Sequence, residues 1–107
     1  MKVQNIKDFY RGWFIGDFEP SILKTDKFEI AVLNHARGEI WPKHYHAVAT
    51  EYNVLLEGHM TVCGVELFKN DVFTIYPNEV ADPIFHEDCR ILCVKVPSLR
   101  GDKYETI

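Results

Sequence analysis

Short runs of apolar and β-branched residues recur along the whole chain and alternate with turn residues. Glycines and Asn-Asp, Pro-Asn and Asp-Pro pairs interrupt the runs about every 6 to 12 residues, a spacing typical of all-β sandwiches and barrels. Strands are predicted within residues 12–18, 28–36, 49–58, 59–68, 71–77 and 89–97. The fourth range is expected to be a hairpin that turns near Gly64. Any helix is expected to be short and to lie in an N-terminal extension, around residues 3–10. The pattern therefore predicts an all-β protein.

Length and composition are those of one globular domain. The chain has 107 residues, of which 47% are hydrophobic and 26% are charged. It contains no repeat, low-complexity tract or linker. Such a chain is expected to fold as a single domain over residues 1–107.

Charge and hydropathy exclude several kinds of partner. The formal net charge is −4, with the two signs well mixed, whereas proteins that bind a phosphate backbone carry basic patches. Nucleic acid is therefore not an expected partner. No apolar run is long enough to span a membrane, and the N-terminus lacks the apolar segment of a signal peptide. The protein is expected to be cytoplasmic, with no membrane partner.

The three cysteines, Cys63, Cys89 and Cys93, lie in apolar segments that resemble strands. Cys89 and Cys93 are four residues apart on one predicted strand, about 13 Å, which is too far for a disulfide. No C-x-x-C motif is present. We expect reduced, buried thiols without a catalytic role.

The segment 38–58, GEIWPKHYHAVATEYNVLLEG, places His44 and His46 two residues apart on a predicted strand, so both side chains point to one face. Pro42 suits the start of this strand. AVAT is short enough to be a turn, which lets Glu51 on the next strand lie beside the two imidazoles. Two neutral imidazoles and one carboxylate suit iron, zinc, manganese or nickel. Without a metal, an enclosed Glu51 carboxylate would need a protonated histidine as its partner.

The same segment matches the first motif of the cupin superfamily, G-x5-H-x-H-x3,4-E-x6-G, at every fixed position from Gly38 to Gly58. The chain resembles a small single-domain cupin over roughly residues 28–97. The resemblance implies a double-stranded β-helix, or jelly-roll barrel, with its core in that range and a divalent metal site inside the barrel mouth. The family's metal ligands transfer to His44, His46 and Glu51.

The second cupin motif, G-x5-P-x-G-x2-H-x3-N, fits NDVFTIYPNEVADPIF only in part. Asn70 and Asn78 stand for its two glycines, and asparagine tolerates positive φ. Ala81 stands where the family has a fourth ligand, a histidine, and alanine cannot bind a metal. The site is then completed by water, completed by a replacement, for which Asp82 is the candidate, or lost. Surface or core roles are expected for the other histidines, His35, His59 and His86.

Strand parity indicates the walls of the expected barrel. If Glu51 faces inward, Asn53 faces inward with it and Tyr52 points to the other side. Tyr52 and Tyr76 are the candidates for moving protons during catalysis. The residues expected at a substrate pocket are Trp41, Asn53, Phe73 and Phe85. Trp41 and Tyr76 are expected either to stack on a ligand or simply to pack. A cavity with apolar walls and one polar end suits a small polar molecule such as a sugar or a carboxylate.

Tyr52, Val54 and Leu56 form an apolar stripe on the other face of the same strand. Such a stripe is expected to be covered, either by the N-terminal segment that carries Trp13 and Phe14 or by a second subunit. Small cupins commonly dimerise in this way, so the resemblance implies a homodimer.

Three functions are open from the sequence. The first, which we prefer, is a metal-dependent enzyme, and the sequence does not distinguish an isomerase or epimerase, a dioxygenase and a lyase. The second is a non-catalytic cupin that binds or senses a small ligand and acts through a partner. The third is a metal-free structural cupin, which Ala81 favours.

Overall fold

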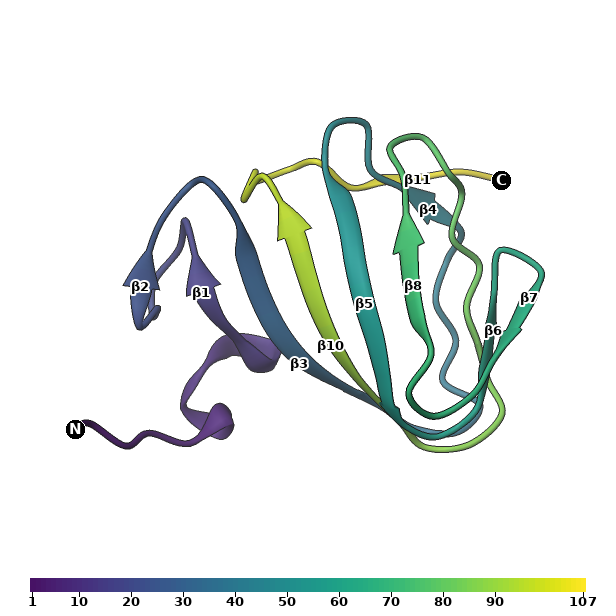
Figure 1. The fold of residues 1–107 in the computed structure, drawn as a ribbon. Helices are drawn as coiled ribbons and strands as arrows, with labels where there is room; N and C mark the ends of the chain where they lie inside the picture. Colours follow the sequence, from purple (N-terminus) through teal and green to yellow (C-terminus); the bar gives the residue numbers. More distant parts are fainter.

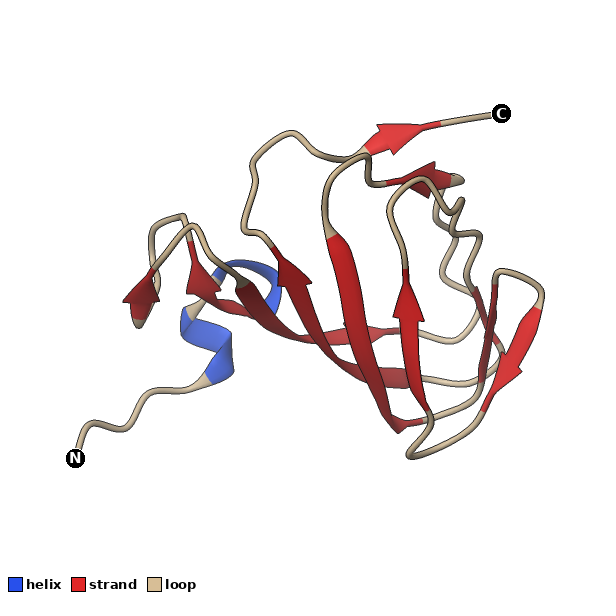
Figure 2. Cartoon of the chain, turned by 45° about the horizontal axis from the view of Figure 1, so that its top comes forward, coloured by secondary structure: helices blue, strands red, loops and turns tan.

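The computed structural model describes all 107 residues, and strands dominate it (Figures 1 and 2). Its strands are β1 (Trp13–Gly16), β2 (Leu23–Lys24), β3 (Glu29–His35), β4 (His44–Tyr45), β5 (Thr50–Glu57), β6 (Met60–Val62), β7 (Val65–Leu67), β8 (Val72–Ile75), β9 (Ile84–Phe85), β10 (Cys89–Val96) and β11 (Tyr104–Glu105). Two single-turn 3-10 helices, η1 (Ile6–Asp8) and η2 (Tyr10–Gly12), precede β1. The all-β prediction and the short N-terminal helical segment are thus confirmed. No helix has the length and apolar content needed to cross a membrane.

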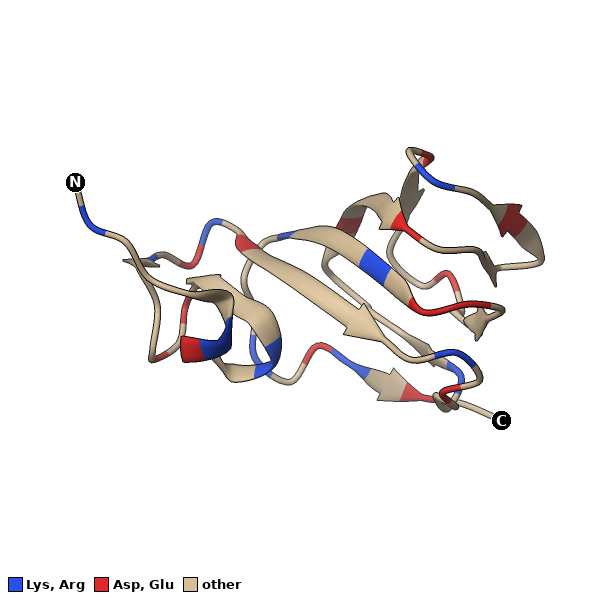
Figure 3. Cartoon of the chain, turned by 90° about the horizontal axis from the view of Figure 1, so that it is seen from below, with Lys and Arg blue, Asp and Glu red and all other residues tan.

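The strands form three sheets that curve around one interior. The large sheet has the order β2-β1-β3-β10-β5-β8, and smaller sheets have the orders β7-β6-β9 and β11-β4. Figure 1 shows the large sheet as one curved wall, with the two small sheets beyond its β8 edge, on the side away from β2. Seen from below, acidic and basic residues are interspersed along the chain (Figure 3).

Turn residues fix the connections between the predicted strands. Cys63 and Gly64 both have positive φ, 52° and 73°, which is the geometry of a two-residue hairpin turn between β6 and β7. Gly58 has φ of 102°, and a Cβ atom there would lie 2.4 Å from the Asp88 carbonyl oxygen. Asn70 and Asn78, which replace two motif glycines, also adopt positive φ, 74° and 69°. The turn at Cys63 corrects one expectation, because it leaves this thiol exposed while Cys89 and Cys93 are buried and free.

The hydrophobic core lies between the large sheet and the β7-β6-β9 sheet. Its buried residues are Leu55, Met60, Val62, Leu67, Ile75, Ala81, Phe85, Cys89 and Ile91. Strand parity holds as predicted on β5, since Asn53 and Leu55 are 4% and 0% exposed whereas Tyr52 is 48% exposed. The part of the interior near β4 and the start of β5 carries the polar residues described below.

The C-terminal segment after β10 returns to close this part of the interior. β11 pairs with β4 in the register Tyr104↔Tyr45 and Glu105↔His44, and the Tyr45 and Tyr104 rings stack with centroids 5.3 Å apart. Figure 1 shows this segment running past the ends of β5 and β8 to β4. Residues beyond the expected barrel core are therefore part of the wall around the candidate site.

Candidate functional site

A cavity of about 900 Å³ lies inside the barrel. Its lining includes His44, His46 and Glu51 together with all four residues expected at a pocket, Trp41, Asn53, Phe73 and Phe85. Half of its 32 lining residues are hydrophobic. The cavity therefore combines apolar walls with one cluster of titratable groups, as small-molecule sites do.

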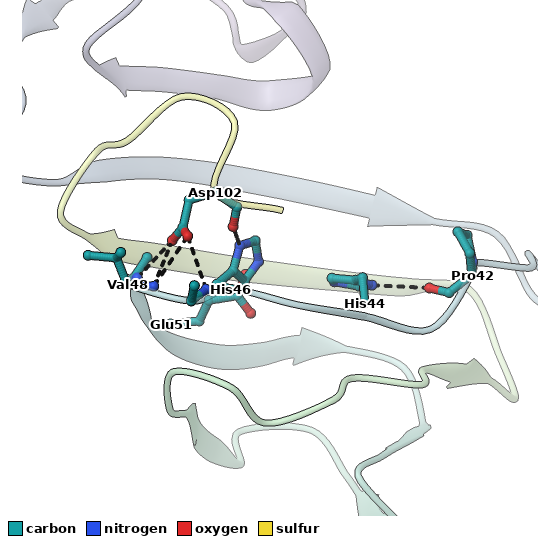
Figure 4. Close-up of polar contacts among 8 residues, drawn as sticks. Pro42, His44, His46, Val48, Glu51 and Asp102 are labelled. Atoms are coloured by element: carbon teal, nitrogen blue, oxygen red, sulfur yellow. Dashed lines mark hydrogen bonds and ion pairs between the residues drawn. The ribbon is translucent and has the colours of Figure 1, made fainter. Parts of the chain in front are cut away.

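His46 and Glu51 meet at the base of this cluster. His46 Nε2 lies 3.2 Å from Glu51 Oε1, and the two side chains are only 7% and 14% exposed. Figure 4 shows His46 between Glu51 and the C-terminal segment. The turn 47–49 between β4 and β5 brings the two residues together, as the spacing predicted.

Asp102, from the C-terminal segment, holds both His46 and the turn that follows it. The His46 Nδ1–H donates to the Asp102 carbonyl oxygen. The buried Asp102 carboxylate accepts from the backbone N–H groups of Ala47, Val48 and Ala49, with N···O distances of 2.8–3.2 Å. Burial would raise the pKa of Asp102, but these backbone donors outweigh it and lower the pKa. One residue thus fixes the orientation of the imidazole and the shape of the turn.

His44 is oriented in a similar way from the other side. Its Nδ1–H donates to the Pro42 carbonyl oxygen over 3.1 Å, and its ring lies 5.7 Å from the His46 ring, centroid to centroid, at an interplanar angle of 79°. The backbone of His44 pairs with Ala81 through hydrogen bonds of 3.1 and 2.7 Å. The buried methyl group of Ala81 also lines the cavity, so the position of the family's fourth ligand lies beside His44 and carries no donor atom.

The pKa values of Glu51 and His44 are both lowered, which favours a charged Glu51 carboxylate and a neutral His44 imidazole. Burial would raise the pKa of Glu51, but the hydrogen bond with His46 and the positive charge of Lys95 outweigh it, and the pKa lies below its usual range. Burial lowers the pKa of His44, and the positive charge of Lys103 acts in the same direction. Burial raises the pKa of Cys93, which also lines the cavity, so this thiol is not a thiolate nucleophile at neutral pH.

The chemistry of the three donors fits a divalent metal ion. Both histidines donate Nδ1–H to a backbone carbonyl. In metal sites, a histidine whose Nδ1–H makes such a hydrogen bond binds the metal through Nε2. As the side chains lie, no three His, Cys, Asp or Glu groups are grouped closely enough to hold an ion. His46 and Glu51 contact each other instead, so an ion would have to replace their hydrogen bond.

Three residues suggested by the sequence lie outside the cavity. Tyr52 points to the outer face because its parity on β5 is opposite to that of Glu51, and Tyr76 is 60% exposed in a turn where its N–H bonds the Glu79 carboxylate. Asp82 is exposed, and its carboxylate lies 4.0 Å from Lys43 Nζ. The structure therefore gives Tyr52 and Tyr76 no position for proton transfer and does not bring Asp82 to the proposed ligands.

The cavity also contains residues that the sequence patterns did not predict as part of the site. His35, treated as an isolated histidine, contacts the Glu39 carboxylate, which also accepts from Trp41 Nε1 over 2.6 Å. Lys95 and Lys103 line the cavity as well. The sequence could have predicted Lys95 at the cavity, because Lys95 and the buried Cys93 are two residues apart on β10 and so face the same side. No sequence pattern pointed to Asp102 and Lys103, since they lie beyond the motifs.

The comparisons with known proteins identify the fold. No protein-family model matches the sequence, and no curated protein matches it. Among solved structures, a conserved protein with a double-stranded β-helix domain from Klebsiella pneumoniae superposes with a TM-score of 0.70 at 14% identity, over 98% of this chain and 91% of that one. The polyketide cyclase RemF from Streptomyces resistomycificus gives a TM-score of 0.68 at 20% identity, over 78% of this chain and 63% of that one.

The DMSP lyase DddQ from Ruegeria pomeroyi gives a TM-score of 0.69 at 18% identity and covers 88% of this chain. This chain spans about half of that lyase, 49% of its length. At these identities the likeness is one of fold. The chain has the double-stranded β-helix fold of the small cupins.

Proposed function

We propose that this protein binds a divalent metal ion through His44, His46 and Glu51 and uses it to bind or transform a small polar molecule, a sugar or a carboxylate, in the cavity. The observation that carries the proposal is the pair of backbone contacts at Nδ1, from Pro42 to His44 and from Asp102 to His46. These contacts select one tautomer in each ring and leave both Nε2 atoms for a ligand.

The donor set gives each residue a distinct part in this function. Glu51 supplies the negative charge, and the two neutral imidazoles supply the nitrogens that first-row transition metals prefer. A bound ion would act as a Lewis acid or, in the case of iron, as a redox centre. Phe73 and Phe85 contribute apolar walls to the cavity. Ala81 leaves space where a further protein ligand would otherwise stand.

Two enzymes that share this fold support a role in binding or transforming a small molecule. A lyase and a polyketide cyclase both act on small molecules and share the barrel described above. A non-catalytic binder would use the same cavity, so a screen of small sugars and carboxylates by thermal shift should be followed by product analysis of each hit. Product formation favours an enzyme, whereas binding without product favours a sensor.

One observation favours a metal-free cupin instead. The His46–Glu51 contact of 3.2 Å satisfies both groups as an ion pair, provided that the imidazole carries protons on both nitrogens. Under that reading the pair would be structural, and transition metals would not stabilise the protein.

Metal-free protein, prepared by chelation and dialysis, is expected to gain thermal stability when zinc, manganese, nickel or iron(II) is added. At a metal concentration of about 100 times Kd, a single site that exists only in the folded state adds about 2.7 kcal/mol to the free energy of unfolding. Calcium is the control, because it prefers oxygen ligands and gains little from two imidazoles. If no transition metal raises the unfolding temperature more than calcium does, the metal-free reading holds.

We also propose that the protein is a homodimer formed through the outer face of the large sheet. On this face Tyr52, Val72 and Val96 are 48%, 74% and 41% exposed, and Val54 pairs with Val72 and Leu92 in register. N-terminal residues such as Phe9 and Trp13 line the cavity on the inner side of the sheet, and Tyr52 and Val72 stay exposed, so the N-terminal segment leaves this outer face open. A second copy would bury a continuous apolar surface there.

Val72→Lys is expected to convert a dimer into a monomer, because it would place two ammonium groups in the apolar interface. Light scattering after gel filtration measures the mass of each species. Val65→Lys is the matched control, since Val65 is 57% exposed but lies on β7, in the β7-β6-β9 sheet. A wild-type protein that is already monomeric, or a Val72→Lys variant that remains dimeric, would contradict the proposal.

A further inference from the structure

Asn53 carries an unpartnered donor inside the cavity. The residue is 4% exposed, and its Nδ2 has no hydrogen-bond partner in the protein. A buried amide without a partner costs on the order of 1–3 kcal/mol, so such a group in a cavity indicates a ligand atom that accepts from it. On β5 Asn53 follows Glu51 on the same face and lines the same cavity. The acceptor would therefore lie next to the proposed metal ligands.

Two lysines stand at the same cavity without a carboxylate in direct contact. The Lys95 Nζ lies 4.9 Å from the centroid of the Trp13 ring, and the Lys103 Nζ lies 4.4 Å from that of Trp41. All ion pairs of this protein with an N···O distance of 4.0 Å or less involve other residues. Neither ammonium group therefore lies within 4.0 Å of a carboxylate. Lys95 is the register partner of Glu51, so it stands diagonally across from Asn53. An ammonium group held over an indole keeps its charge and its N–H donors available.

Most carboxylates at the cavity are already occupied. Asp102 is held by three backbone N–H groups, Glu39 by His35 and Trp41, and Glu51 by His46. Glu29, the register partner of Lys95 on β3, makes no ion pair within 4.0 Å. Burial raises the pKa of Glu29, although the positive charge of Lys95 opposes this. The free hydrogen-bonding groups that face the cavity are thus mainly donors.

We propose that the small molecule bound in this cavity carries a carboxylate group, and that Asn53, Lys95 and Lys103 hold this group. The inference deepens the proposed function by selecting a carboxylate over a neutral sugar, and it rests on that function for the cavity but not for the metal. A carboxylate accepts several hydrogen bonds at once, so it can take the Asn53 amide and both ammonium groups. A neutral sugar hydroxyl satisfies the amide but leaves both charges unpaired.

An alternative role for Lys95 is to balance Glu29 and Glu51, its register neighbours on both sides. In that case the lysine would contact one of these carboxylates, whereas the structure places its ammonium over Trp13. The alternative also leaves Lys103 and the Asn53 amide without a function. If Lys95 only balances the two glutamates, metal-free protein should not prefer a carboxylate ligand, whereas the proposal predicts that it does.

The test is a set of titrations of metal-free protein, followed by two-dimensional amide NMR, with acetate, malonate and succinate and with their amides of equal size. At least one carboxylate is expected to bind about tenfold or more tightly than its amide, since charge-assisted hydrogen bonds are the stronger ones. Lys95→Met and Lys103→Met are each expected to weaken that binding about tenfold. Asn53→Leu is expected to weaken it while leaving the free protein at least as stable, because the unpartnered amide is removed. Lys43→Met, which alters an exposed lysine paired with Asp82, is the control and should bind as wild type does.

The inference is overturned if no carboxylate of the panel binds more tightly than its amide, or if Lys43→Met weakens binding as much as the two cavity variants. Lys103 is exposed, so its variant remains informative even if Lys95→Met fails to fold. The metal content of each protein is measured separately. A protein that binds carboxylates but no metal supports the inference and contradicts the metal site. A protein that binds metal but prefers amides overturns the inference alone.

Discussion

Replacing Asp102 with alanine is expected to lower the free energy of unfolding by about 3 kcal/mol, because a buried, charged acceptor of several backbone hydrogen bonds is lost. The N–H groups of Ala47, Val48 and Ala49 would lose the carboxylate that binds them at 2.8–3.2 Å. The turn that carries His46 toward Glu51 would lose its support at the same time. Urea unfolding of the two proteins measures the difference.

The pH dependence of this difference gives a second readout. The folded protein holds the pKa of Asp102 below its ordinary value, so the stabilising effect is fully present above the unfolded pKa, about 3.9. It is lost as the pH falls through the lower folded pKa. The difference in the free energy of unfolding between wild type and Asp102→Ala should therefore be constant near neutral pH and should decrease only below about pH 4.

Asp82→Ala is the matched control for Asp102→Ala. Asp82 is also an aspartate in a loop near β4, but it is exposed and has one cation at 4.0 Å. Its removal should change the free energy of unfolding by less than about 0.5 kcal/mol. Equal effects of the two substitutions would show that the Asp102 carboxylate does not hold the turn.

His46→Ala is expected to weaken binding of zinc by about 100-fold or more, because it removes a ligand, whereas loss of an outer partner typically costs about 10- to 100-fold. His46 is the most constrained of the three donors, since Nδ1 is fixed by Asp102 and Nε2 faces Glu51. Isothermal titration of metal-free protein with zinc measures the affinity. Protons compete with a metal ion for imidazole and carboxylate ligands, so zinc binding should also weaken as the pH is lowered.

His59→Ala is the control for this experiment. His59 is also paired with a glutamate, Glu66, at 2.7 Å, but the pair lies on the β6–β7 hairpin and does not line the cavity. Its substitution should leave zinc affinity unchanged. If His46→Ala and His59→Ala weaken zinc binding equally, the metal is bound at unspecific surface histidines and the proposed site is wrong.

Local sequence pattern was sufficient for most of the fold and for the centre of the site. Alternation on β5 placed Glu51 and Asn53 inside and Tyr52 outside, because side chains in a strand point to opposite faces in turn. The short turn after His46 brought Glu51 to its imidazole as expected. These relations involve residues close in the chain, so their geometry follows from strand parity and turn length.

Residues that reach the site from distant segments had no such local pattern. Asp102 is 56 residues from His46 in the chain, and only the folded path of the C-terminal segment brings them together. Lys103 is placed over Trp41 by the same segment. Tyr76 was a candidate for proton transfer, but the second motif fits only in part there, and Tyr76 lies in a turn with its side chain exposed. Long-range closure of the barrel therefore decides which residues surround the candidate metal ligands.

Crystals grown with zinc, examined by anomalous diffraction at the zinc edge, test most directly whether the three side chains share one ion. A single strong peak is expected in the cavity, about 2.0–2.2 Å from Nε2 of His44, Nε2 of His46 and a carboxylate oxygen of Glu51. The peak should coincide with the loss of the His46–Glu51 hydrogen bond. A cavity without a peak while that hydrogen bond persists, or a peak only at His59 and His86 on the outer surface, would contradict it.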